Sequence, residues 1–278
     1  MTAHSVAARP RPWADLPDAD AGAVTGVLTD IDDTLTTDGA ITPDALGALT
    51  RLRAAGLPVI AITGRPMGWS APFVRPLGQG GWPVEAIVAE NGAVALFREG
   101  DSLAVEYAQD HMTRRSNAGR LREVAARVLR EVPGATLARD SAGRVTDIAI
   151  DHSEFARLDR TQIDAALAVM RAAGMSATVS SIHINGWFGD HNKLSGACWT
   201  VQRLLRRDLD AERGQWVYVG DSTNDQLMFG HFPVSVGVAN LVAFADKLVT
   251  WPTFLTFGAR GAGFAEVADR LLGRSGRA

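Results

Sequence analysis

Short apolar runs rich in β-branched residues alternate with longer amphipathic segments near both ends of the chain. In the first series we expect a strand, a helix and a strand at residues 24–29 (VTGVLT), 45–55 and 57–63 (LPVIAIT). In the second we expect a strand, the start of a helix and a strand at residues 216–219 (WVYV), 224–229 and 234–238 (VSVGV). Strand runs that are apolar almost throughout are typical of a parallel sheet covered by helices on both faces. The two series therefore predict two parts of one doubly wound α/β sheet.

The segment between the two series has a different character. It has two long helical patterns, at residues 117–131 and 158–173. It also has extended runs at residues 144–151 (RVTDIAID) and 176–184 (SATVSSIHI). Helices on one face of a small, partly antiparallel sheet are the natural unit for such a pattern. We therefore predict a flexible tail at residues 1–20 and a discontinuous core at residues 21–94 and 187–273. In this prediction an α+β cap is inserted into this core at residues 95–186.

Composition excludes several classes of function. The chain has 278 residues, with 28 Lys and Arg against 31 Asp and Glu, so it lacks the strong positive field that binds nucleic acid. Its single cysteine, Cys198, excludes intrachain disulfides and cysteine-based zinc sites. Neither a signal-peptide core nor a run of about 20 apolar residues is present. These features predict a cytoplasmic protein whose partner is a small molecule, not nucleic acid or a membrane, and they do not indicate an oligomeric state.

The most informative segment is residues 28–35 (LTDIDDTL), where an apolar strand runs directly into Asp30, Asp32 and Asp33. Carboxylates this close repel one another unless a cation neutralises them. At the carboxyl end of a parallel strand, Asp30 and Asp32 could hold Mg²⁺ and act on a phosphate. The alternative is a solvated acidic turn that caps a helix.

A second strand ends in Thr63, Gly64 and Arg65. The threonine hydroxyl could donate to a phosphoryl oxygen, and the glycine would let the backbone turn close to it. Taken alone, the same tripeptide is equally consistent with an ordinary turn after a strand.

A third strand ends in residues 220–225 (GDSTND). Asp221 and Asp225 are four residues apart, so on a helix that begins near Ser222 they would lie about one turn apart on the same side. One carboxylate could then bind a metal ion while the other orients it. The alternative is an Asp or Ser cap on a surface helix.

Lysine is rare in this chain, with Lys193 and Lys247 alone among the 28 cationic residues. Lys193 lies in residues 190–196 (DHNKLSG), just before an amphipathic helix. A compact ammonium there could neutralise both a nucleophilic carboxylate and a phosphate. The alternative, a surface lysine in a first helical turn, is weakened because the helix dipole disfavours a cation at that end.

In chain order, DIDDT, TGR, the isolated lysine and GDSTND resemble the four signature motifs of the haloacid dehalogenase (HAD) superfamily of phosphohydrolases. The insertion between TGR and Lys193, with residues 90–93 (ENGA), is similar to the Cof-like subfamily IIB, which includes sucrose, trehalose and mannosylglycerate phosphate phosphatases. The resemblance spans roughly residues 24–270. It implies a HAD-like, Rossmann-like core with a cap of the C2B type.

The resemblance also implies a role for each matched residue. Asp30 would be the nucleophile that forms an aspartyl-phosphate, and Asp32 the general acid and then base. Thr63 and Lys193 would hold the phosphoryl oxygens. Mg²⁺ would be bound by the Asp30 and Asp221 carboxylates and the Asp32 main-chain carbonyl. Asp225 would also belong to the metal site, where it would orient the groups that bind the ion. The remaining phosphate- or substrate-binding candidates are Asp33, Thr34, Gly64, Arg65, Asn91 and Asn224. One departure is that Asn192 and Leu194 flank the lysine, where many members have a glycine.

The leading interpretation is a Mg²⁺-dependent phosphatase that hydrolyses a small phosphorylated metabolite, most plausibly a sugar phosphate. Its cap would supply selectivity, with candidates at Arg114, Arg115, His183 and Trp187, whose alternative roles are surface charge and ordinary core. A phosphomutase shares the fold and motifs. A non-catalytic phospho-receiver or metabolite sensor is a further alternative, although it would not need the cap. Residues 258–263 (GARGAG) lack the GxGxxG dinucleotide pattern, and we interpret them as a loop that lines the core.

Overall fold

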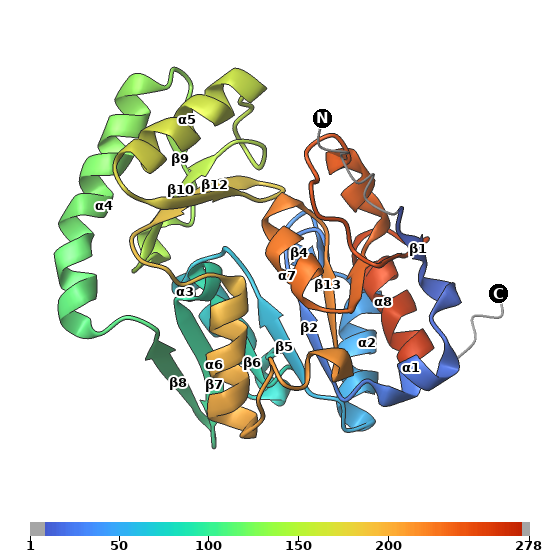
Figure 1. The fold of residues 1–278 in the computed structure, drawn as a ribbon. Helices are drawn as coiled ribbons and strands as arrows, with labels where there is room; N and C mark the ends of the chain where they lie inside the picture. The colour runs from blue at the N-terminus through green and yellow to red at the C-terminus, as the bar shows by residue number, and fades with distance from the viewer. Residues whose placement is uncertain (1–8, 274–278) are drawn as a thin grey trace. The chain divides into compact units, whose positions relative to one another are not determined.

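The structure, a computed structural model, describes residues 9–273 (Figure 1). The part of the predicted flexible tail at residues 1–8 lies outside these residues. Within the described chain there are two compact units: the first unit, residues 9–61 and 201–273, and the second unit, residues 62–200. In residues 9–273 no helix has the length and apolar character needed to cross a lipid bilayer.

The first unit is built on a parallel sheet in which the strands at residues 26–29, 59–62, 216–220 and 234–237 match the predicted apolar runs, while two short strands were not predicted. Their order is β1 (Arg11–Pro12), β15 (Phe254–Leu255), β14 (Val234–Gly237), β13 (Trp216–Gly220), β2 (Gly26–Thr29) and β5 (Val59–Ile62). The central strands β2, β13 and β14 are buried along their whole length. This confirms the α/β sheet predicted from the near-continuous apolar character of the strands.

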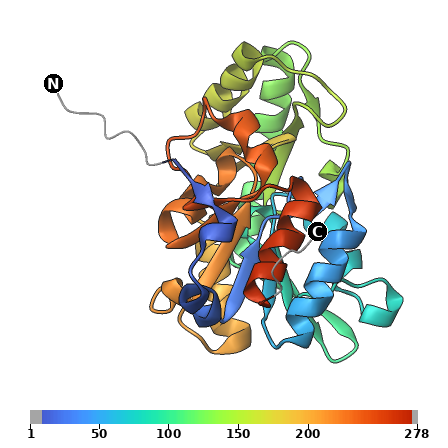
Figure 2. The same cartoon turned by 90° about the vertical axis from the view of Figure 1, so that its right-hand side faces the viewer.

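Helices cover this sheet, and α2 (Pro43–Ala54) lies beside α8 (Arg260–Leu271) (Figure 2). Thr42 caps α2 by accepting from the amide of Ala45, which explains why the helix begins before the predicted residue 45. Gly261 permits the close packing, because a Cβ there would lie 1.9 Å from the Thr42 hydroxyl oxygen. The other helices that belong wholly to the first unit are α1 (Asp18–Ala23) and α7 (Gln226–His231). Helix α6 (Lys193–Leu205) begins in the second unit and ends in the first.

The structure differs from the predicted tail over residues 11–20. Strand β1 pairs with β15, and the side chain of Trp13 is fully buried, with its ring 5.5 Å from that of Phe254. Burial of a large aromatic side chain offsets the entropy lost by ordering this short segment.

The second unit contains two antiparallel sheets. The first consists of β6 (Ala86–Ala89), β7 (Val94–Glu99) and β8 (Ser102–Tyr107), and a short helix, α3 (Met67–Ser70), precedes it in the chain. The second sheet has the order β11 (Ser176–Val179), β12 (His183–Trp187), β10 (Asp147–Asp151) and β9 (Thr136–Leu137). Helices α4 (His111–Glu131) and α5 (Arg160–Ala172) pack on it. The whole predicted cap lies within this unit.

Two predicted elements of the second unit differ in extent. Residues 176–184 form a hairpin instead of one run, because the Ser180 amide donates to the His183 carbonyl and the Ser180 hydroxyl accepts from the His183 amide. Helix α4 begins six residues before the predicted residue 117, because Asp110 caps it by accepting from the Thr113 amide over 3.0 Å.

The four-stranded sheet has one apolar face and one polar face, as the period of two in its strands requires. Ile148, Ile150 and Ile184 join the apolar core formed with α4 and α5. On the opposite face the side chains are polar but buried: Asp147, Asp151, His183 and Asn185. Buried polar groups need hydrogen-bond partners, so these four side chains are expected to bond to other residues of the protein.

Candidate active site

Strand register brings the first and last acidic motifs together. Asp30 directly follows β2 and Asp221 directly follows β13, and these parallel neighbours are aligned so that Thr29 lies opposite Val219. The Asp30 amide donates to the Val219 carbonyl over 2.8 Å. Both carboxylates therefore lie at the carboxyl edge of the same sheet, the edge at which α/β sheets bind ligands.

Asp30, Asp221 and Asp225 form a buried acidic cluster. One carboxylate oxygen from each lies within 4.8 Å of the others, and none of the three side chains is more than 4% exposed. Ionised carboxylates this close, removed from water, repel one another strongly. Their oxygens are the donors that Mg²⁺ prefers, so the residues present fit a divalent cation.

Asp225 uses its carboxylate to hold the backbone of the motif. It accepts from the amides of Asp221 and Ser222 over 2.9 and 3.1 Å, and from the hydroxyl of Tyr218 over 2.5 Å. Gly220 makes room for it, because a Cβ there would lie 2.5 Å from an Asp225 oxygen. Burial, together with the neighbouring Asp225 and Asp30 carboxylates, raises the pKa of Tyr218 well above its ordinary value. Asp225 is thus arranged to orient Asp221.

The turn after Asp30 is held by the carbonyl of Ile31, which accepts from the amides of Thr34, Leu35 and Thr36 over 2.9–3.2 Å. Asp32 lies in this turn and is half-buried. Asp33 adopts a left-handed backbone with φ of 54°, and its carboxylate pairs with Arg260 over 2.9 Å. Thr34, also expected to bind phosphate or substrate, is fully buried.

Asn240, which the sequence did not single out, completes the acidic edge. Its side-chain amide nitrogen donates to the Asp33 carbonyl over 3.0 Å and to the Asp221 carboxylate over 3.3 Å. Its oxygen accepts from the Arg260 amide over 2.8 Å. The glycine-rich segment therefore contacts this edge through Arg260. The available signal was position, because Asn240 lies three residues after the end of β14, near the same edge of the sheet.

In the second unit, hydrogen bonds connect the TGR motif to the ENG motif. Thr63 is fully buried, its amide donates to the Val88 carbonyl, and its carbonyl accepts from the Asn91 amide over 3.0 Å. Asn91 adopts a left-handed backbone with φ of 55°, which asparagine tolerates well. Gly64 lies beside the Asn91 side chain.

Lys193 begins helix α6 and is 4% exposed. Asn192 caps this helix: its side chain accepts from the Ser195 amide over 3.0 Å, and its own amide donates to the Ser195 hydroxyl over 2.9 Å. Gly92 has φ of 106°, and a Cβ on it would lie 2.0 Å from the Asn192 carbonyl oxygen. The close approach of these two turns therefore requires glycine at position 92. The ENG turn thus packs against the lysine turn, and Asn192 supplies the cap of that turn.

Arg65 is held by acidic residues of the predicted cap. Its guanidinium pairs with Glu154 over 2.8 Å and with Asp140 over 3.2 Å. The other oxygen of Glu154 lies 2.9 Å from His183. Burial disfavours the ionised form of Glu154, but hydrogen bonds from His183 and Arg65 outweigh this effect and lower its pKa to about 2. The sequence did not single out Glu154 or Asp140.

The remaining candidates have local contacts. Arg114 packs over the Tyr107 ring, Arg115 is exposed, and the Trp187 indole donates to the His191 carbonyl over 2.9 Å. The Asn224 side-chain oxygen accepts from the Ser222 hydroxyl over 2.9 Å. The candidates therefore fall into two groups: an acidic group in the first unit (Asp30, Asp32, Asp221, Asp225) and a hydroxyl-and-lysine group in the second (Thr63, Gly64, Asn91, Lys193).

Residues 27–115 match the family model described as haloacid dehalogenase-like hydrolase. This segment is therefore similar to the haloacid dehalogenase-like hydrolases. The matched segment contains the first acidic motif, the TGR motif and the ENG turn. No curated protein matches the sequence.

Solved structures share this HAD-like fold over nearly the whole chain. A HAD/Cof-like hydrolase from Plasmodium vivax has a TM-score of 0.64 at 15% identity, covering 93% of this chain and 100% of the other. The sucrose-phosphatase of Synechocystis sp., solved with sucrose and phosphate, has a TM-score of 0.61 at 17% identity, covering 88% and 97%. A trehalose-6-phosphate phosphatase related protein has a TM-score of 0.57 at 15% identity, covering 89% and 98%. The chain therefore shares its fold with these proteins.

Proposed function

We propose that this chain is a Mg²⁺-dependent phosphatase that hydrolyses a small phosphorylated metabolite, most plausibly a sugar phosphate, in the cytoplasm. The observation that carries this proposal is the buried cluster of Asp30, Asp221 and Asp225 at the carboxyl end of β2 and β13, with Asp32 two residues after Asp30. A buried acidic cluster without a cation would be strongly destabilising, and phosphoryl transfer needs a cation at this place.

Asp30 and Asp221, with the main-chain carbonyl of Asp32, would hold the Mg²⁺. When bound, the ion would neutralise charge on the phosphoryl oxygens and reduce their repulsion of an attacking carboxylate. Asp225, fixed by Tyr218 and two amides, would keep the Asp221 backbone in place.

The chain's own residues would carry out two displacements. An Asp30 carboxylate oxygen attacks phosphorus, and the bond from phosphorus to the ester oxygen breaks while Asp32 donates a proton to that leaving oxygen. Asp32 then takes a proton from water, which attacks the aspartyl-phosphate and releases inorganic phosphate and free Asp30. Thr63 and Lys193 would bind the phosphoryl oxygens.

The sugar-phosphate assignment is supported by the similarity of the fold to that of a sucrose-phosphatase. A phosphomutase would share the site but protect its aspartyl-phosphate from water. Phosphate release without a bisphosphate activator would favour the phosphatase.

The experiment is a phosphate-release screen over phosphorylated metabolites in Mg²⁺, followed by kcat/KM for sugar phosphates, phosphoglycolate and nucleotides. We expect sugar phosphates to give the highest values. Asp30→Asn should abolish turnover, whereas Asp44→Asn, at an exposed position on α2, should retain it. Normal activity of Asp30→Asn would overturn the assignment of Asp30 as nucleophile. Values of kcat/KM that are no higher for sugar phosphates than for phosphoglycolate and nucleotides would overturn the proposed substrate class. Phosphorylation by a kinase partner without hydrolysis would instead indicate a receiver.

A further inference from the structure

A loop of the predicted cap lies directly against the TGR segment of the same unit. We call residues 140–147 the docking loop. Its backbone at Gly143 is so close to Gly68 that a Cβ on Gly68 would lie 2.9 Å from the Gly143 Cα. The buried carboxylate of Glu90 joins the two segments, because it accepts from the Met67 amide over 3.1 Å and from the Thr146 amide over 2.6 Å. The contact is therefore made by backbone and buried charge, not by flexible surface groups.

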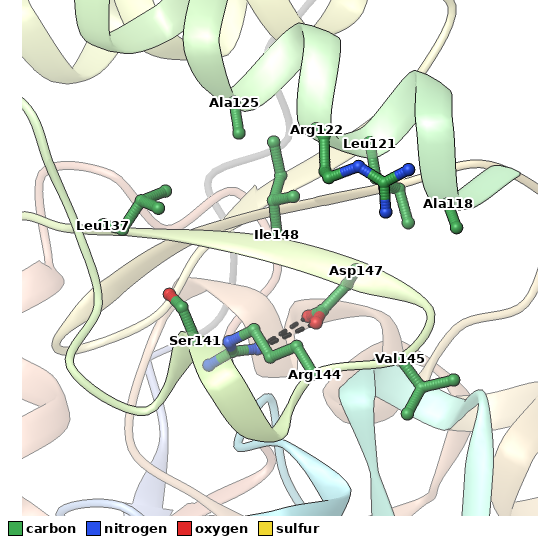
Figure 3. A pocket seen from close by; sticks show the side chains of 10 residues that line it. All are labelled: Ala118, Leu121, Arg122, Ala125, Leu137, Ser141, Arg144, Val145, Asp147 and Ile148. Carbon is green, nitrogen blue, oxygen red and sulfur yellow. Dashed lines mark hydrogen bonds and ion pairs between the residues drawn. The ribbon is translucent and has the colours of Figure 1, made fainter.

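Arg144 in the docking loop reaches the main chain of the TGR motif. Its guanidinium donates to the Gly64 carbonyl over 2.9 Å and is held by Asp147 over 2.8 and 2.9 Å (Figure 3). Asp140 adds a further ion pair over 3.1 Å, and the Arg144 side chain is 2% exposed. Asn185 donates to the same Gly64 carbonyl over 3.3 Å and to Asp147 over 3.0 Å. Two cap side chains thus fix one carbonyl oxygen.

That carbonyl belongs to the peptide group that also contains the Arg65 amide. A trans peptide is planar, so its C=O and N–H point in opposite directions and cannot turn independently. At the opposite edge of this peptide group, the Arg65 amide donates to the Thr63 hydroxyl oxygen over 2.9 Å. Fixing the Gly64 carbonyl therefore also fixes the Arg65 amide. That amide occupies one lone pair of the Thr63 hydroxyl oxygen, so the hydroxyl hydrogen of Thr63 must point away from it.

We propose that Arg144 is a positioning residue for the Thr63 hydroxyl, acting through the Gly64–Arg65 peptide group, so that docking of the cap loop sets the affinity for the phosphoryl group. This inference rests on the proposed phosphatase function, in which Thr63 binds a phosphoryl oxygen. Asp147 and Asp140 already compensate the buried charge of Arg144. Its additional hydrogen bond to the Gly64 carbonyl is therefore the feature that links the docking loop to the TGR motif. Asn185 supports the same carbonyl.

The experiment compares Arg144→Ala and Arg144→Lys with Val128→Ala, which weakens the apolar core of the same unit without touching Gly64. The measurements are kcat and KM for p-nitrophenyl phosphate, the inhibition constant of inorganic phosphate, and Tm. We expect Arg144→Ala to raise the phosphate inhibition constant about tenfold, the effect of one misaligned hydrogen bond. We expect kcat/KM to fall by about ten- to a hundredfold, as small misplacements do. Arg144→Lys should recover part of both, and Val128→Ala should lower Tm alone.

Chemical rescue separates positioning from folding. Arg144 and Asp147 are among the residues that line a pocket (Figure 3), and Arg144→Ala would leave a space of guanidinium size beside the Asp147 carboxylate. We expect guanidinium to restore phosphate affinity in this variant and not to improve Val128→Ala. A second variant, Gly143→Val, keeps the arginine but forces the docking loop from Gly68, and it should weaken phosphate binding in the same way. Gly119→Ala, with no atom near its Cβ position, is its control.

Wild-type phosphate affinity in folded Arg144→Ala and Gly143→Val would overturn the inference. An equal loss of affinity in Val128→Ala would also overturn it, because the effect would then follow stability. A wild-type protein that releases no phosphate from any substrate would contradict the proposed function instead. Calorimetric binding of inorganic phosphate in Mg²⁺ would still test the inference in that case.

Discussion

The backbone amide of Asp221 donates to the carboxylate of Asp225 over 2.9 Å. The spacing of four residues made this proximity possible, but the local structure differs from a regular helix. Residues Thr223–Asp225 form a 3-10 turn, and Ser222 and Asp225 bond reciprocally across it. The result is a compact turn in which one buried carboxylate orients the backbone that carries another.

The first prediction concerns Asp225. Asp225→Asn replaces one acceptor oxygen with an NH₂ group, so it cannot satisfy the Asp221 amide, the Ser222 amide and the Tyr218 hydroxyl together. We expect the affinity for Mg²⁺ to fall by about 10–100-fold, as is common when an orienting partner is lost. The measurement is activity as a function of Mg²⁺ concentration. Tyr218→Phe, which removes one of the three hydrogen bonds, should give a smaller effect, and an unchanged Mg²⁺ requirement in Asp225→Asn would contradict the orienting role.

The second prediction concerns Gly220. In Gly220→Ala the new methyl group would lie 2.5 Å from an Asp225 oxygen, so the carboxylate must move. Overpacking of this kind costs about 1–3 kcal/mol, and we expect both a lower free energy of unfolding and a weaker affinity for Mg²⁺. Denaturant unfolding and Mg²⁺ titration measure the two effects. Gly214→Ala, with open space at the same atom position, is the matched control and should change neither.

The third prediction concerns pH. The pKa of Glu154 is lowered from 4.5 to about 2 in the folded protein, so the unfolded chain takes up this proton first as the pH falls. Glu154 therefore contributes stability that is present above about pH 4.5 and is lost as the pH falls toward about 2. Urea unfolding of the wild type and of Glu154→Gln should show their difference shrinking between about pH 6 and pH 3. A difference that does not change with pH would contradict the ion pair with Arg65 and the hydrogen bond with His183.

The fourth prediction concerns the lysine turn. Asn192→Ala removes the cap of α6, which should destabilise the protein by about 1 kcal/mol and raise KM, because Lys193 is the first residue of the uncapped helix. Asn192→Ser retains a capping oxygen and should recover most of the loss. Thermal unfolding and kinetics measure both variants. Equal stability and KM in Asn192→Ala and Asn192→Ser would show that the cap does not position the lysine.

Some functional contacts could not be predicted because they join residues far apart in the chain. Arg65 was expected to line the pocket, and the structure pairs it with Asp140 and Glu154. Arg144 is an ordinary cation in the sequence, and only the fold places it against the Gly64 carbonyl. The sequence predicted helices on one face of a small, partly antiparallel sheet, but it did not indicate which charges would meet on the other face.

The sequence by itself determined which residues stand at the ends of the strands. An apolar β-branched run followed directly by an acid places that acid at the carboxyl edge of a buried parallel sheet, whatever the order of the strands. Only the tertiary structure decided which strand ends are neighbours, through the β2 and β13 register that brings Asp30 to Asp221. It also decided which groups Tyr218, Asn240 and Arg144 contact. Those contacts depend on packing between distant segments, and local preferences along the chain do not encode such packing.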